Sequence, residues 1–86
     1  MSIDYKITKY FEDNNLFDSD KSNGITIKQD VNTIMIKGNP RDLVELADLL
    51  ANVAASKEKY EHIHIDELTL LNAESDFSDI IIEKID

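Results

Sequence analysis

The sequence predicts an α+β domain of two layers, in which a mainly antiparallel four-stranded sheet (ββαββ) carries one long helix on one face and an N-terminal accessory element. Two short runs of alternating apolar residues precede a long stretch of helical spacing, and two more alternating runs follow it. A chain of 86 residues can bury only one modest core. We therefore expect a single domain over 1–86, with 1–23 as the accessory segment and loop and 24–86 as the ββαββ core.

The first seventeen residues carry an apolar stripe at offsets of four, seven and eight, formed by Ile3, Ile7, Tyr10 and Phe11. This spacing predicts an amphipathic helix, although residues 5–10 also alternate like a strand. The polar residues 18–24 then indicate a loop.

A β-hairpin is predicted next, from the alternating runs 25–28 and 33–37 on either side of a turn at 29–32. One face of this hairpin is apolar. Its isoleucines are Ile25, Ile27, Ile34 and Ile36.

The helix over 40–55 has a clear start signal, because Asn39 can cap free amides, Pro40 suits the first helical position and Asp42 lies in the favourable N-terminal field. An apolar stripe follows, which we assign to the core: Leu43, Leu46, Ala47, Leu50, Val53 and Ala54. The polar side comprises Arg41, Glu45, Asp48 and Asn52.

Two further strands are predicted, at 60–66 and 80–85, with a polar connection between them. The last strand has isoleucines on both faces, so a helix on one side would leave Ile81 and Ile85 exposed. Either the N-terminal segment or a second subunit could cover them. We favour the N-terminal segment, because its own apolar residues also need a place to bury.

The charge of the chain is strongly negative, with 18 acidic and 9 basic residues giving −9. Such a surface repels phosphate backbones and anionic lipid, which disfavours nucleic-acid and membrane binding and favours a basic partner. Acidity also keeps a small protein soluble. The chain has no cysteine, and its start lacks the apolar core of a signal peptide, so we expect a cytoplasmic protein.

Three residues of one strand, His62, His64 and Asp66, share a face because alternate side chains of a strand do. Two imidazoles and a carboxylate could bind zinc or iron, but such sites draw further ligands from other segments, and the chain has no other histidine. A polar strand surface explains the same pattern, and we expect no metal and no cofactor. Because motifs for nucleophilic or phosphate chemistry are also absent, we expect no catalytic residue and no enzyme.

The acidic connection after this strand is the expected partner-binding surface, because loops carry recognition. Phe77 could anchor a partner there, or it could turn inward to the core. The candidate partner-binding residues are Glu67, Glu74, Asp76, Phe77, Asp79, His62, His64 and Asp66.

The order of hairpin, Gly38-Asn39 turn, helix with 43–51, strand 62–66 and closing isoleucine strand resembles the immunity protein 32 family over about 24–84. The resemblance implies a small bacterial α+β protein that is not catalytic and that binds and neutralises a cognate toxin, often a nuclease. An acidic surface would complement a basic nuclease cleft. Two alternatives remain open, a homodimeric structural or regulatory domain that pairs through the strand at 80–85, and a metal-binding protein that uses the His-x-His-x-Asp strand.

Overall fold

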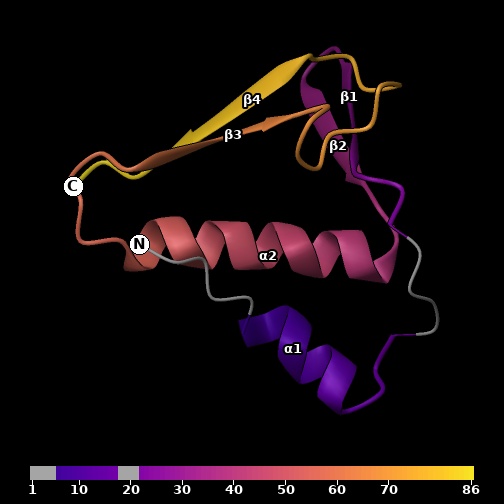
Figure 1. Ribbon diagram of the computed structural model, residues 1–86. Helices are drawn as coiled ribbons and strands as arrows, with labels where there is room; N and C mark the ends of the chain where they lie inside the picture. The colour runs from indigo at the N-terminus through magenta and orange to yellow at the C-terminus, as the bar shows by residue number, and fades with distance from the viewer. Residues whose placement is uncertain (1–5, 18–21) are drawn as a thin grey trace.

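The structure is a computed structural model that describes residues 6–17 and 22–86. Its elements are α1 (Lys6–Asp13), β1 (Thr26–Asp30), β2 (Thr33–Lys37), α2 (Pro40–Ala55), β3 (His62–Asp66) and β4 (Asp79–Glu83). Figure 1 shows α2 at the centre, with both β-hairpins on one side of it and α1 on the other. The fold is therefore α+β with the expected order of strands and helix after the accessory element.

The strands form two antiparallel two-stranded sheets, β1–β2 and β3–β4, and the expected single four-stranded sheet is not found. In the described part of the chain one isolated parallel bridge is found, between Ile25, just before β1, and Leu71, in the connection between β3 and β4. The physical reason lies at the outer edge of β1. Its main-chain groups bond to residues 70–76, which have no strand of their own beyond that bridge, so the ladder ends there.

The hairpin β1–β2 has a tighter turn than the expected 29–32, since Asp30 pairs directly with Thr33. Ile27 lies opposite Ile36, so the predicted apolar face is confirmed. The later strands are shorter than expected. Tyr60 adopts a left-handed backbone conformation (φ 58°) before β3, and β4 ends at Glu83.

The core lies where the two hairpins meet above α2. Its buried members are Ile25, Ile27, Ile65, Leu70 and Leu71. Half-buried side chains pack around them from α2, β3, β4 and the connection: Leu46, Leu49, Ile63, Phe77, Ile80 and Ile82. This core is small, as the chain length requires.

The bounds predicted for α2 are confirmed, and so is its cap, because the Asn39 side chain accepts a hydrogen bond of 2.9 Å from the Asp42 backbone N–H. The predicted core stripe is wrong at one edge. Leu43 and Leu50 remain 43% and 42% exposed, and the buried side of α2 centres on Leu46, Leu49 and Val53 instead. Because the strands form two separate hairpins, no continuous sheet covers that edge of the helix.

The accessory segment forms a helix, α1, rather than a strand, and it packs against α2 (Figure 1). We expected this segment to cover the last strand, and that expectation is wrong. Ile81 and Ile85 remain 57% and 89% exposed. Of the residues expected to mediate that cover, Ile3 lies outside the described residues, as does most of the predicted 18–24 loop. Ile7 and Phe11 are half-buried on the other side of α2.

Candidate partner-binding face

The hairpin β3–β4 has one buried and one exposed face, and its register assigns the side chains. Ile63 pairs with Ile82, and Ile65 with Ile80, so these four side chains face the core. The alternate residues point away from it and form what we call the outer face. The outer face consists of His62, His64, Asp66, Asp79, Ile81 and Glu83.

The centre of the outer face is apolar and its margin is acidic. Ile81 lies directly opposite His64, and the rings of His62 and His64 meet edge to face with centroids 5.2 Å apart. Asp66 and Asp79 lie across from each other at one end, and Glu83 lies at the other. An apolar centre with a polar rim is the usual composition of a protein–protein interface.

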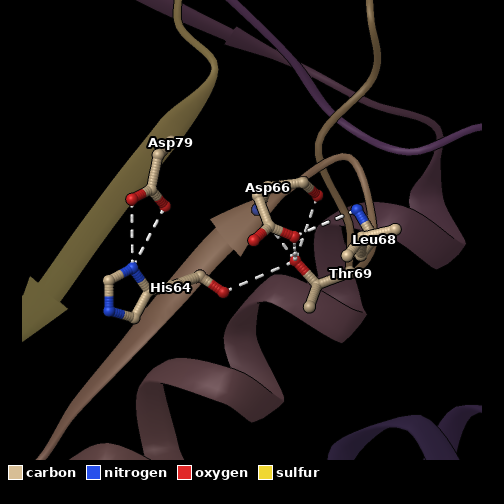
Figure 2. A network of polar contacts seen from close by, with 5 residues as sticks. All are labelled: His64, Asp66, Leu68, Thr69 and Asp79. Atoms are coloured by element: carbon tan, nitrogen blue, oxygen red, sulfur yellow. Dashed lines mark hydrogen bonds and ion pairs between the residues drawn. The ribbon is translucent and has the colours of Figure 1, made fainter.

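The polar groups at one end of the outer face are held in place by hydrogen bonds (Figure 2). The His64 Nδ1 atom lies 3.0 Å from an oxygen of Asp79. An Asp66 carboxylate oxygen accepts from the backbone N–H of Leu68 at 3.0 Å and lies within hydrogen-bonding distance of the Thr69 hydroxyl. These contacts leave few free rotamers at this end, which lowers the entropy lost on binding.

The other candidates lie on the connection between β3 and β4. Glu67, Glu74 and Asp76 are exposed, but Phe77 is half-buried and packs against the core. Phe77 therefore anchors the connection to its own domain, which is the second of the two roles considered for it. Sequence reasoning included neither Ile81 nor Glu83 among the candidates, although the alternation from Asp79 places both on the same face.

Asp76 has a structural task as well. One of its carboxylate oxygens accepts a 2.7 Å hydrogen bond from the backbone N–H of Gln29, and Lys28 lies 3.6 Å from the other. The hydrogen bond from Gln29, reinforced by the Lys28 charge, lowers the pKa of Asp76 below its ordinary value. Asp76 thus fastens the connection to β1 as a carboxylate.

The three residues considered as metal ligands do not converge. Within the described residues there is no group of three or more histidine, aspartate or glutamate side chains that could hold a metal ion. His64 contacts Asp79, whereas Asp66 bonds to Leu68 and Thr69 in its own turn.

The burial of two carboxylates on α2 was not predicted from the sequence. Asp48, 1% exposed, accepts hydrogen bonds from the backbone N–H groups of Ile7 and Thr8 and from the Thr8 hydroxyl, and so caps α1. Asp42, fully buried, accepts from the Ser22 hydroxyl and the Asn23 backbone N–H. The sequence shows acidic residues in a helix, but their partners lie 19 to 41 residues away.

Glu45 lies on the same side of α2 near these carboxylates. Burial raises its pKa, and the negative charge of Asp42 adds to the effect, while Arg41 at 3.7 Å opposes it. The surface between α1 and α2 therefore contains acids that are buried with structural partners, whereas the acids of the outer face are at least partly exposed.

Neither helix of the described chain is both long and apolar enough to cross a membrane.

Comparison with known proteins gives one match. The family model of immunity protein 32 matches residues 33–85, from the first residue of β2 to just beyond β4. The chain belongs to this family, whose members are immunity proteins. The match lies within the expected 24–84 except for one residue, and it leaves α1 and β1 outside. No curated protein and no solved structure matches the chain.

Proposed function

We propose that this protein is a non-enzymatic immunity protein that binds a cognate toxin with a basic surface, and that the outer face of β3–β4 makes the contact. Membership of the immunity protein 32 family supports the class of function. The single observation that supports the surface is the register of β3–β4, which gathers three carboxylates and both histidines around Ile81.

The charges suit a basic partner. Asp66, Asp79 and Glu83 bring three carboxylates to one small face, and Glu67 follows Asp66 directly in the chain. A concentrated field of one sign attracts an oppositely charged surface and raises the rate of association by 10-fold to about 1,000-fold at low salt. A nuclease is one such partner, since its substrate cleft must attract phosphates.

Ile81 adds an exposed apolar side chain to the charges of this face. It is 57% exposed at the centre of a rigid antiparallel pair, so a partner that covers it removes apolar surface from water without reordering the backbone. The acidic margin would then steer the toxin, and the apolar centre would slow its dissociation.

The test is co-expression with the protein encoded next to this chain, followed by a toxicity rescue assay and a pull-down. We expect rescue and a stable complex with the native chain. We expect both to weaken for Ile81→Asp, which places a charge in the centre of the face. The matched control is Val31→Asp, which makes the same apolar-to-acidic change at an exposed residue in the β1–β2 turn.

Rescue without physical association would contradict inhibition by binding. Equal rescue and binding by both variants would contradict the outer face as the contact surface while leaving the class of function intact.

A further inference from the structure

The strand β2 is exposed on both of its faces, unlike every other strand of the described chain. Its three central residues are large and apolar. Ile34, Met35 and Ile36 are 62%, 51% and 50% exposed. An apolar strand of this kind at the edge of a sheet is a template for pairing with another strand.

The outer edge of β2 carries main-chain groups that can pair. Ile25, Ile27 and Gln29 use their main-chain groups to bond with residues 70–76. Because hydrogen-bonding directions alternate along a strand, the residues between them face β2, where they meet Thr33, Met35 and Lys37. The groups of Ile34 and Ile36 consequently point outward, and no residue in ranges 6–17 and 22–86 bonds to them.

A second strand, β4, also has an outer edge. The hydrogen bond from the Lys84 N–H to the Glu61 carbonyl sets its phase, so the outward groups belong to Asp79, Ile81 and Glu83. Thr69 and Leu71 already bond to the outer edge of β3 at His64 and Asp66. Within the described residues, a second copy could therefore pair with the five residues of β2 or with the five of β4.

The charged residues on the two strands decide which edge suits pairing of two copies. A two-fold axis at Ile81 would place Asp79 opposite Glu83 of the second copy, twice, and like charges directly opposite each other are destabilising. A two-fold axis at Met35 would place Ile34 opposite Ile36 of the second copy, and Thr33 opposite Lys37. The same row continues to Asp30, which pairs with Thr33, so Lys37 of the second copy would approach a carboxylate.

We propose that two copies of this chain associate through antiparallel pairing of β2 with β2 about a two-fold axis at Met35. The four strands then form one sheet in the order β1–β2–β2–β1. Ile27 and Ile36 of one copy then line up with Ile34 of the other, and the two neighbouring rows of three isoleucines make one apolar row pair across the sheet. The interface is isologous, as in most homodimers, and it leaves the outer face of β3–β4 out of the pairing.

The sharpest test uses the absence of cysteine from this chain, since any introduced cysteine is its only thiol. A two-fold axis at Met35 brings both copies of residue 35 to a Cα separation of about 4.5 Å, within reach of a disulfide. Met35→Cys should therefore form covalent dimers in a glutathione redox buffer. The matched control is Ile81→Cys, which lies at the centre of the other edge with similar exposure.

We expect the crosslinked fraction to be at least about tenfold higher for Met35→Cys, because pairing raises the effective concentration of its thiol. Equal crosslinking of the two variants, or more at residue 81, would overturn the proposal.

Sedimentation of the native chain gives a second measurement that needs no cysteine. The mass should rise with concentration from 9.8 kDa to twice that value, and added salt should favour the dimer by screening the charge of −9 on each copy. Ile34→Lys should weaken association roughly 100-fold, since it introduces two charges into the apolar row. Val31→Lys adds the same charge in the exposed turn and should leave association unchanged.

Circular dichroism must show that both lysine variants are folded. A folded Ile34→Lys that dimerises like the native chain, or a native chain that stays monomeric at all concentrations, would refute pairing through β2.

Discussion

The two hairpins of this protein have strands of equal length and opposite character. β3–β4 packs four isoleucines against the core and turns a charged face outward, whereas β1–β2 buries only the β1 side and leaves β2 exposed and apolar. The first is held by apolar packing, and the second is held at its outer edge by the polar side chains of Ser75 and Asp76. The comparison shows that the acidic outer face and the apolar edge strand β2 lie on different hairpins.

The largest expected effect concerns apolar packing, where the two hairpins should respond differently to the same kind of truncation. Ile65→Ala on β3 removes a side chain that is 1% exposed and should lower the free energy of unfolding by about 3 kcal/mol. Ile34→Ala on β2 should change it by less than about 0.5 kcal/mol at concentrations where the chain is monomeric. Urea unfolding measures both, and similar losses would break the comparison.

Carboxylate anchoring comes next in size, and it extends the contrast to α1. Asp48→Ala leaves the N–H groups of Ile7 and Thr8 without their buried acceptor and should destabilise the protein by about 2–3 kcal/mol. Asp13→Ala removes only an exposed ion pair with Lys9 and should have an effect below about 1 kcal/mol. If the two changes were equal in urea unfolding, α1 would not depend on this cap.

A smaller effect should appear in the pH dependence of stability, because the Asp76 carboxylate clamps the connection to β1 through its hydrogen bond from Gln29. The lowered pKa of Asp76 means that its stabilising effect is complete above about pH 4 and is lost as pH falls through the folded-state pKa. Asp76→Asn should therefore lower the melting temperature at pH 7, and the difference from the native chain should shrink toward pH 2. A difference that does not depend on pH would exclude the ionised carboxylate as the clamp.

The effect of Glu45 on stability should change with pH in the opposite direction to that of Asp76. Its raised pKa means that the folded protein holds a proton more tightly than the unfolded chain, so ionisation of Glu45 opposes folding as pH rises. Glu45→Gln should be more stable relative to the native chain at pH 7 than at pH 4, as thermal melting at both values would measure. The same pH trend for Asp76→Asn and Glu45→Gln would contradict one of the two assignments.

Local patterns in the sequence were enough to predict the hairpin β1–β2, the bounds of α2 and the approximate positions of β3 and β4, and their spacing indicated the helix α1. The Asn39-Pro40 start signal and the alternation in β1 and β2 depend on neighbours in the chain, so they can be recognised without a structure. The assembly of the sheets could not be predicted in this way. Bonding of residues 70–76 to β1 is a long-range contact made partly by side chains, and nothing in alternation reveals it.

The candidate site, too, could be predicted only where it depends on local pattern. Alternation correctly places His62, His64 and Asp66 on one exposed face, but only the cross-strand register adds Asp79, Ile81 and Glu83 to it. Phe77 illustrates the converse, since an aromatic side chain in an acidic connection is compatible with either role until its packing is known. Which of these residues contacts a partner remains a prediction.

The most direct test of the proposed function is the association rate constant of the toxin with the native chain and with the triple variant Asp66→Asn, Asp79→Asn, Glu83→Gln, measured against salt concentration. We expect the native rate to fall steeply with salt, and the triple variant to associate about tenfold more slowly at low salt with a shallower slope. The matched control neutralises Asp13, Asp30 and Glu58, which are exposed outside β3 and β4, and should keep most of the native rate. Identical salt slopes for the native chain and the triple variant would contradict the acidic outer face as the surface that captures the toxin.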